Sequence, residues 1–406
     1  MAPASTDRAL PALAWLLGGM LAVLLVGGAA VWYLTQTSGG RERVLTLTLD
    51  RLGGGIRGNL QVERATGNLL TGATLYGVSL RDSTGEPFVL ADSAFLDYDL
   101  RTLTTPRIHI ERAVLYSPEI YVYQLPGDTL WNYQKLFPPG EKPGPQRYTL
   151  VDRAWLIDAD VRVRIPWEPV DTAPRARRRE IREALADTSP VMVQQVRGGY
   201  LRTINLRGMS GALRDVRFAP GTQAGSYFGI DSLFGTVQFF RTPFKVEKLR
   251  GELQLVENRV EFRAPVFDLP DSRISTAGVI TLAERRGDDP RYDVTFTSDS
   301  VALRDLRWLY PRFPRDATGA LSLLVETRPG GTLFLARNLR MRAPGTRLAG
   351  GFGMIAGDTI RFVDVNLRAA PLDVATLEGM LPDSLPVRGL RIGSVEIRGP
   401  TGRERS

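Results

Sequence analysis

Glycine recurs along this chain too often for long helices, and its spacing constrains the fold more than any other feature. In residues 67–80, GNLLTGATLYGVSL, glycines at Gly67, Gly72 and Gly77 leave only short apolar runs between them. Glycine interrupts a helix before propagation can compensate for unfavourable nucleation. The segment therefore predicts short strands separated by turns.

An alternation of apolar and polar residues with period two supports this prediction. It occurs in VLTLTL (44–49), VRVRI (161–165), RYDVTFTSD (291–299) and ALSLLVETR (320–328). Such alternation is typical of strands with one buried face. In RIHIERAVLYSPEIYVYQL (107–125) it places Ile108 and Ile110 on the same face of a strand. Further along, Ile120 and Val122 lie on one face, and the tyrosines that alternate with them lie on the other. Turn residues separate these runs, so the sequence predicts many antiparallel strands with tight turns.

Three short helices and one linker interrupt the β pattern. Residues 173–187, APRARRREIREALAD, carry apolar residues four apart among many charges, as an exposed helix does. Residues 303–311 and 371–382 are shorter helical patterns that each end against a proline. The Pro/Gly-rich residues 138–147 predict a linker between a β module at 41–137 and a repetitive β region at 148–406. A repeat is suggested by NRVEFRAP (258–265) and NLRMRAP (338–344).

An uncharged apolar run precedes the β pattern. It extends from Ala9 to Leu34, and as a helix at about 1.5 Å per residue it exceeds the roughly 30 Å hydrocarbon core. Trp15, Trp32 and Tyr33 lie toward its ends, where amphipathic rings favour the membrane interface. A cleaved signal peptide is the alternative, but the run is longer than a usual h-region and lacks a clear A-x-A site. The sequence predicts an uncleaved anchor at 9–34, with residues 1–8 in the cytoplasm and the rest translocated.

The composition excludes several kinds of catalytic and metal site. There is no cysteine and only one histidine, His109, so thiolate zinc sites, cysteine nucleophiles and multi-histidine metal sites are excluded. GGGIRG (53–58) matches a dinucleotide-binding pattern, but the residues after it predict a strand where that site needs a helix. Ser210 lacks a nucleophile elbow, and His109 is the one histidine that could serve it as a base. The sequence thus predicts no enzyme, no cofactor and no metal.

Paired carboxylates are the remaining candidates for acid–base chemistry. Asp97/Asp99 and Asp158/Asp160 are spaced to share one face of a strand, and Asp288/Asp289 precede a proline. Buried in a cleft, such a pair could transfer protons. We interpret them instead as the wet face of strands and as a turn.

Positive charge dominates the balance, with 52 Lys+Arg against 44 Asp+Glu and a formal net charge of +8. The densest basic run is RARRREIR (175–182). Nucleic-acid binding would bring interleaved aromatic residues or a known reading motif, and neither is nearby, so no nucleic-acid partner is predicted. The run is interpreted as a solvated helix face or as a contact with anionic headgroups through Arg175, Arg177, Arg178 and Arg179.

Several phrases, taken in order, resemble the AsmA-like and TamB-like proteins of bacterial envelopes. After the apolar anchor come GNLLTGATLYGVSLRD, LADSAFLDYDLRTL, RIHIERAVLYSPEIYV and DTLWNYQKLF, then DLRWLYPRFP and LRMRAPGTRLAGGFGMIAGDTIRFVDVNLRAAPL. The resemblance covers most of the chain, as an N-terminal portion or a short member of the family. It implies a mainly β fold: an N-terminal transmembrane helix followed by an elongated, curled antiparallel sheet with an apolar, groove-like side and a few short helices.

The resemblance also implies a location and a function. The chain would be a single-pass inner-membrane protein with its bulk in the periplasm, and its partners would be phospholipid, the inner membrane and an outer-membrane β-barrel protein. Its groove would shield phospholipid or let it pass between the inner and outer membranes. Alternation along the strands predicts which residues line the groove. They are Ile108, Ile110, Ile120, Val122, Val294, Phe296, Leu321 and Leu323.

Two alternatives stay open at this point. Ordinary β-sandwiches whose inward faces meet would produce the same alternation. A scaffold or chaperone for outer-membrane protein assembly would use open strand edges to pair with client strands. A continuous apolar lining favours lipid, whereas a polar or closed interior with an open edge favours a protein client.

Overall fold

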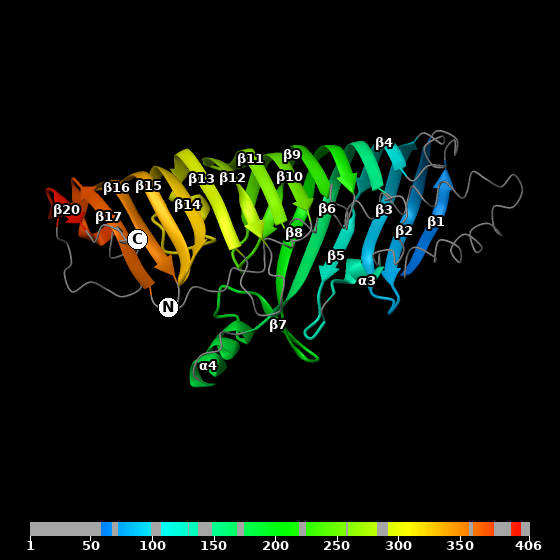
Figure 1. The fold of residues 1–406 in the computed structure, drawn as a ribbon, viewed down its shortest axis with the longest axis horizontal. Helices are drawn as coiled ribbons and strands as arrows, with labels where there is room; N and C mark the ends of the chain where they lie inside the picture. Colours follow the sequence, from blue (N-terminus) through cyan, green and yellow to red (C-terminus); the bar gives the residue numbers. More distant parts are fainter. Residues whose placement is uncertain are drawn as a thin grey trace, which may run out of the picture. The chain divides into compact units, whose positions relative to one another are not determined.

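The computed structural model describes residues 58–66, 72–98, 107–128, 130–136, 148–168, 174–218, 225–256, 259–281, 291–356, 360–376 and 391–398. Within these ranges the chain is mainly β, with one large, mostly antiparallel sheet and few helices (Figure 1). The predicted anchor at 9–34, the strand at 44–49 and the linker at 138–147 lie outside the described residues. No helix in these ranges has the length and apolar character needed to cross a membrane.

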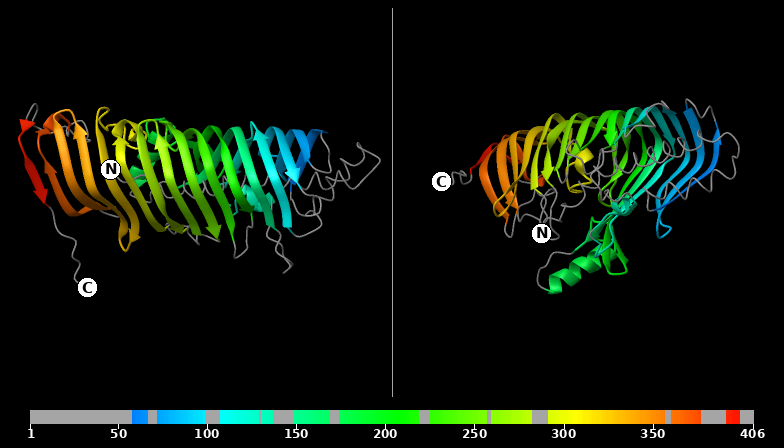
Figure 2. Two further views of the ribbon diagram at one scale, coloured as in Figure 1. Left: turned by 90° about the horizontal axis from the view of Figure 1, so that it is seen from above. Right: turned by 45° about the vertical axis from the view of Figure 1, so that its right-hand side comes forward.

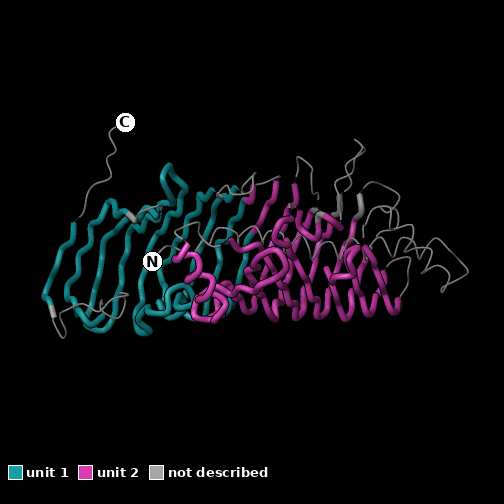
Figure 3. The backbone as a smooth tube through the Cα atoms, turned by 90° about the horizontal axis from the view of Figure 1, so that it is seen from below, with its two compact units in different colours: residues 1–4, 244–251, 261–406 teal, residues 5–243, 252–260 magenta. Residues whose placement is uncertain are grey.

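Two compact units divide the chain (Figure 3). Unit 1 holds residues 244–251 and the described residues from 261 onward, and unit 2 holds those up to 243 together with 252–260. The division therefore lies near residues 243–261. The strands on either side of 138–147, where the sequence suggested a boundary, both belong to unit 2.

Unit 2 is built on strands that follow from the alternating segments of the N-terminal half. Its elements are β1 (Gly58–Thr66), β2 (Gly72–Asp82), β3 (Pro87–Tyr98), β4 (Arg107–Tyr116), β5 (Glu119–Tyr123), α3 (Asn132–Leu136), β6 (Tyr148–Trp167), α4 (Pro174–Leu185), β7 (Val193–Val196), β8 (Gly199–Phe218) and β9 (Ser226–Gln238). Antiparallel pairing joins β1 to β2, β2 to β3, β3 to β4, β6 to β8 and β8 to β9. Gly58, the last glycine of GGGIRG, opens β1, so a strand stands where a dinucleotide site would need a helix.

The pairing of β6 departs from the predicted antiparallel pattern. β4 and β5 both run parallel to β6, with Tyr116 opposite Ile157 and Glu119 opposite Asp160. They act as one long strand interrupted at Ser117, whose φ is 45°. A parallel pair needs a crossover of a dozen or more residues, and β5 and β6 are separated by more than that number in the sequence.

Alternation along these strands builds an apolar core in unit 2. Val161, Val163 and Ile165 are 8%, 0% and 1% exposed, while Arg162 between them is exposed, as the period-two pattern predicted. The cross-strand partners Val122, Val163 and Ile204 are all at most 1% exposed. Burying one such side chain contributes about 1.5–3 kcal/mol. This row of direct partners therefore fixes the register of three strands.

Unit 1 is an antiparallel meander of strands in chain order (Figure 2). Its strands are β12 (Ser272–Thr281), β13 (Arg291–Ala302), β14 (Thr318–Arg328), β15 (Gly331–Ala343), β16 (Thr346–Ala356), β17 (Ile360–Ala369) and β20 (Val395–Arg398), with a separate small pair of β18 (Leu372–Asp373) and β19 (Arg391–Ile392). β10 (Phe244–Val256) and β11 (Arg259–Leu269) contribute residues to both units.

One-residue bulges bend these strands, and the residues on either side of a bulge still point to the same faces of the sheet as their partners. In β15, Ser322 lies opposite Arg337 and Ala320 opposite Arg340, so three steps on one strand match two on the other. Asn338 takes up the extra residue with a φ of 53°, a left-handed conformation that Asn tolerates better than most residues. Asp158, Asp215 and Asp364 have the same sign of φ within β6, β8 and β17.

The helix predictions fare unequally. The pattern at 173–187 is confirmed as α4. At 303–311 only the single 3-10 turn η3 (Leu303–Leu306) forms, because the backbone N–H groups of Leu309 and Tyr310 both return to the Leu306 carbonyl and turns follow. At 371–382 the first residues form β18, which pairs with β19, and the predicted helix begins only at Val374. Residues beyond 376 lie outside the described ranges. The helix α3 was not anticipated.

Candidate functional site

The four site residues predicted in β13 and β14 lie together on one face of unit 1. Phe296 lies opposite Leu323, and Val294 lies opposite Val325. Direct cross-strand partners point to the same side of a sheet. Leu321 lies opposite Ser298, two positions along the same face. The two strands thus present one continuous apolar surface.

This surface continues across β15, β16 and β17. Val325 is followed in adjacent strands by Phe334, Met354 and Phe362, each opposite the one before. A second row runs through Leu323, Ala336 and Phe352. We call the apolar face the set of Val294, Phe296, Leu321, Leu323, Val325, Phe334, Ala336, Phe352, Met354 and Phe362.

The apolar face is only partly covered. Val294 and Ala336 are 4% exposed, but Phe362 is 57% exposed and the other members are intermediate. Ordered aromatic and aliphatic side chains that stay open to solvent forfeit burial energy of about 25 cal/mol per Å². Such a surface is suited to an apolar occupant.

The opposite side of the same strands differs in composition and packing. Asp293, Thr295 and Thr297 alternate with the apolar residues of β13 and are exposed. Two leucines on that side, Leu333 and Leu335, are 2% and 7% exposed. The Leu335 side chain lies over Gly353, where it approaches the position of a Cβ to 3.3 Å. Leu333 and Leu335 are therefore packed against the sheet, whereas Leu324, Ile355 and Val363 on the same side are half-buried. Both sides thus carry partly open apolar residues, and the apolar face holds the most exposed of them, Phe362.

The predicted site residues of unit 2 lie in its core. Ile110, Ile120 and Val122 are 0%, 1% and 0% exposed, and their partners in β6 are Val151, Val161 and Val163. The side chain of Ile108 is outside the described set, although its backbone lies in β4. The two sets of predicted residues thus fall in different units with different degrees of burial.

The basic residues at 175–179 lie on α4, which stands apart from the sheet strands of unit 2 (Figure 2). Arg175, Arg178 and Arg179 are exposed along with Arg177, and Arg179 reaches Glu183 one turn on at 3.7 Å. An exposed pair of this kind contributes about 0.3–0.5 kcal/mol. The helix therefore presents a solvated positive surface.

Arg241 fastens α4 to the sheet. Its guanidinium donates to the carbonyls of Ala184, Ser189 and Val191 and pairs with Asp187 at 2.7 Å. Cations near a helix C-terminus also interact favourably with the helix dipole. Arg241, just after β9, thus fastens the C-terminal end of α4, while β7 in the same excursion pairs with β8. Sequence analysis missed this residue, which carries no local signal.

The candidate catalytic residues do not converge. The His109 Nε2 atom lies 2.9 Å from Asp152 Oδ1, whereas Ser210 Oγ accepts a hydrogen bond from the Asp158 backbone N–H at 2.9 Å. Asp160 accepts one from the Gly208 backbone N–H. Asp97 pairs with Arg112 at 3.1 Å across the β3–β4 strand pair. Each of these groups has a structural partner of its own, whereas Asp99, Asp288 and Asp289 lie outside the described residues.

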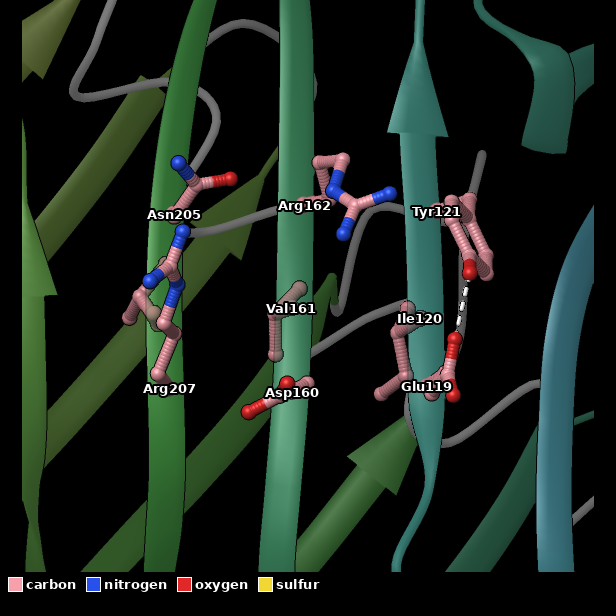
Figure 4. A pocket seen from close by; sticks show the side chains of 9 residues that line it. Glu119, Ile120, Tyr121, Asp160, Val161, Arg162, Asn205 and Arg207 are labelled. Atoms are coloured by element: carbon pink, nitrogen blue, oxygen red, sulfur yellow. Dashed lines mark hydrogen bonds between the residues drawn. The ribbon is translucent and has the colours of Figure 1, made fainter.

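A shallow depression in unit 2 gathers polar side chains from β5, β6 and β8 (Figure 4). Arg162 lies 5.4 Å from the centre of the Tyr121 ring, and Tyr121 donates a hydrogen bond to Glu119. Burial and the bond to Glu119 raise the pKa of Tyr121. The neighbouring Arg207 and Asn205 come from β8, and Asn205 donates to Gln238 at 3.3 Å. These groups stabilise one another as cross-strand pairs.

A buried polar network joins the β2–β3 turn to β5 and α3. Asp82, 8% exposed, accepts hydrogen bonds from the Thr84 hydroxyl, the backbone N–H groups of Thr84 and Glu86, and the Tyr123 hydroxyl at 2.6 Å. Burial alone would raise its pKa, but these hydrogen bonds outweigh burial, and the pKa of Asp82 lies below its usual value. Burial, together with the hydrogen bond to Asp82, raises the pKa of Tyr123. The turn sequence Asp-Ser-Thr-Gly was the available signal.

Asn132 completes this network. It is 1% exposed, its Oδ1 accepts from the backbone N–H groups of Tyr123 and Tyr133, and its Nδ2 donates to the Tyr121 carbonyl. The side chain thus ties the first turn of α3 to β5. In the described ranges no group of acidic or imidazole side chains is arranged to hold a metal ion.

Comparison with known proteins gives no match, because no family model fits the sequence and no curated protein or solved structure is significantly similar.

Proposed function

We propose that this chain is a membrane-anchored envelope protein of the AsmA-like or TamB-like type, whose apolar face shields phospholipid acyl chains as they pass between the inner and outer membranes. The observation that carries the proposal is the partly open apolar face of unit 1. Residues 9–34 supply the anchor in the inner membrane, and the sheet lies in the periplasm.

The amount and kind of exposed surface support acyl chains as the occupant. The face runs over five adjacent strands and consists of aliphatic and aromatic side chains. Each methylene group moved from water onto such a surface gains about 0.8 kcal/mol. A row that includes Val325, Phe334, Met354 and Phe362 crosses strand after strand at about 4.8 Å spacing. A flexible chain can therefore slide along it with little change in contact energy, which favours passive movement.

The headgroup of the lipid needs a different environment from its tails. A phosphate stays in water or beside cations, because burying an unpaired charge costs far more than the methylene groups gain. The exposed arginines Arg175, Arg177, Arg178 and Arg179 of α4 are the proposed headgroup contacts in unit 2. This role would place α4 beside a bilayer surface.

Native mass spectrometry of the purified full chain tests lipid binding directly. We expect co-purified phospholipid to be retained by the unaltered protein and lost from the double variant Phe296→Asp/Leu323→Asp, because two carboxylates on facing positions make the apolar face polar. Thr295→Asp/Ser322→Asp is the matched control, since it places the same charges on the other side of the same two strands.

Circular dichroism of each variant shows whether the sheet is kept. Lipid retained by a folded Phe296→Asp/Leu323→Asp protein would overturn the proposal. A photo-crosslinking residue at Phe352 extends the test to cells, where we expect crosslinks to phospholipid. Crosslinks to an outer-membrane protein in place of lipid would instead favour the scaffold function.

A further inference from the structure

One end of the unit 1 sheet carries an unusual row of residues. Ala302 lies opposite Thr318, Thr318 opposite Arg342, and Arg342 opposite Arg347. Both arginines are exposed. Like charges directly opposite one another destabilise a sheet pair, so this placement works against folding stability.

The two arginines make no ion pair in the part of the chain that the structure describes, and neither does Arg315 nearby. One carboxylate, Asp373, lies at this end beside the β15–β16 turn and accepts a hydrogen bond from the Ala375 backbone N–H. Other carboxylates nearby are engaged elsewhere. Asp271 pairs with Arg304 at 2.6 Å, and Asp305 accepts hydrogen bonds from Ser272 and the Asp271 backbone. Asp316 stays exposed and offsets part of the charge.

The connection from β13 to β14, residues 303–317, emerges from the same row (Figure 1). It is held in place at both ends, because the Leu303 N–H donates to the Ala317 carbonyl at 2.9 Å. Trp308 stacks on Phe244 with ring centres 4.4 Å apart, and Tyr310 meets Phe313 edge to face at 5.2 Å. Arg307 donates to the Phe313 carbonyl at 3.0 Å.

Leu309 is the exception in this well-fastened connection. Its neighbours Trp308 and Tyr310 are both held by ring contacts, yet Leu309 itself is 55% exposed. The fold thus presents a leucine to solvent on a fixed backbone, between two amphipathic aromatic residues. Unpaired arginines lie along the sheet end from which this backbone emerges.

We infer that this end of unit 1, formed by Leu309, Arg315, Arg342 and Arg347, docks on the surface of an anionic lipid bilayer. Leucine and aromatic residues favour the boundary between headgroups and acyl chains. Arginines at the same end of the sheet attract anionic headgroups by about fivefold in affinity for each residue. Contact with phosphate groups also relieves the repulsion between the facing Arg342 and Arg347.

A bilayer fits these observations better than the other polyanions. Nucleic acid would use the arginines but would gain nothing from an exposed leucine, and it would call for aromatic residues free to stack on bases. An acidic protein would require a complementary apolar pocket for Leu309. The inference goes beyond the proposed function, because docking requires no lipid on the apolar face.

Vesicle flotation tests the docking. The full chain, held in nanodiscs of zwitterionic lipid, is mixed with vesicles of phosphatidylcholine alone or with added phosphatidylglycerol. We expect binding to the anionic vesicles that weakens as salt is added. The variant Arg342→Glu/Arg347→Glu should weaken it about tenfold or more, and Leu309→Asp should weaken it with less change in salt dependence.

The matched control is Arg291→Glu/Arg361→Glu, which makes the same change of charge at the opposite end of β13 and β17. Equal loss of binding in this control would overturn the inference, because net charge alone would then explain the attraction. Unchanged binding of Arg342→Glu/Arg347→Glu would overturn it as well, and so would preferential binding to an acidic protein or nucleic acid added as competitor. Co-purified phospholipid is expected to be unaffected by these variants, so the docking and the proposed function fail separately.

Discussion

Asp82 shows how a single carboxylate can organise a strand junction. It receives four hydrogen bonds from three residues, and one of them comes from the Tyr123 hydroxyl in β5. A hydrogen bond to a charged group contributes about 1.5–3 kcal/mol. The β2–β3 turn is therefore bound to β5, which is far from it in the sequence.

Replacing this carboxylate should destabilise unit 2 in a pH-dependent way. Because the folded pKa of Asp82 lies below the unfolded value of about 3.9, its stabilisation is present above that pH and is lost as the pH falls through the folded pKa. We expect Asp82→Asn to lower the free energy of unfolding by about 1–3 kcal/mol at pH 7 and by less at pH 3. Urea unfolding at both pH values measures this. Tyr123→Phe, which removes one hydrogen bond, should cost about 1 kcal/mol, and an equal loss for Asp82→Asn at both pH values would refute the assignment.

The bulge residue Asn338 gives a second test at the scale of one residue. Its left-handed backbone penalises branched side chains. We expect Asn338→Val to lower the free energy of unfolding by about 1–2 kcal/mol, whereas Asn338→Gly should change it little. Thermal unfolding of the two variants compares them. A valine that is tolerated as well as glycine would show that the bulge does not require this conformation.

At the scale of elements, period-two alternation predicted the strands well, and pairing was harder. The burial of Val161, Val163 and Ile165 followed directly from the sequence pattern. The parallel pairing of β4 with β6 did not, because the direction of a partner strand depends on a crossover whose residues showed no helical periodicity. The repeat of 258–265 and 338–344 is reflected only in part: each segment lies in a strand that is followed, after a two-residue turn, by the next strand of the sheet, β12 or β16. The offset differs, because the first segment starts β11 whereas the second ends β15.

The attachment of α4 leads to a prediction about this element. Since Arg241 holds three carbonyls and Asp187, we expect Arg241→Ala to release the helix while leaving the sheet intact. Hydrogen exchange measured by mass spectrometry should accelerate in residues 174–191 and stay unchanged in β6 and β8. Arg182→Ala, on the helix itself, serves as the control. Faster exchange throughout unit 2 would mean that Arg241 supports the sheet as a whole.

At the scale of the whole molecule, the predicted lining residues are covered to different degrees in the two units, although unit 2 also exposes Ile157 and Phe234, at 40% and 48%. Unit 2 buries Ile110, Ile120 and Val122 almost completely, whereas unit 1 leaves Phe362 and much of its apolar face open. The sequence placed both groups on apolar faces, but it could not predict this difference. Exposure depends on what covers a face, and the alternation is the same in either case.

This difference predicts that lipid stabilises one unit more than the other. A ligand that binds only the folded state slows its opening in proportion to occupancy. We expect added phospholipid to slow hydrogen exchange in β13 to β17 and to leave β4 to β8 unchanged. The comparison is made by mass spectrometry on the full chain with and without lipid. Equal protection of both units would show that lipid acts on the chain in general.

The bulge in β15 allows the curvature of the sheet to change while the side chains keep their positions on its two faces. Removing Asn338 would return the strand to one residue per partner residue, and Arg337 and Arg340 would keep their places opposite Ser322 and Ala320. Single-residue deletions at such positions would straighten a strand while every leucine and arginine after it kept its side. Over evolutionary time, a sheet of this kind can change its bend through small insertions and deletions and still keep the same lining.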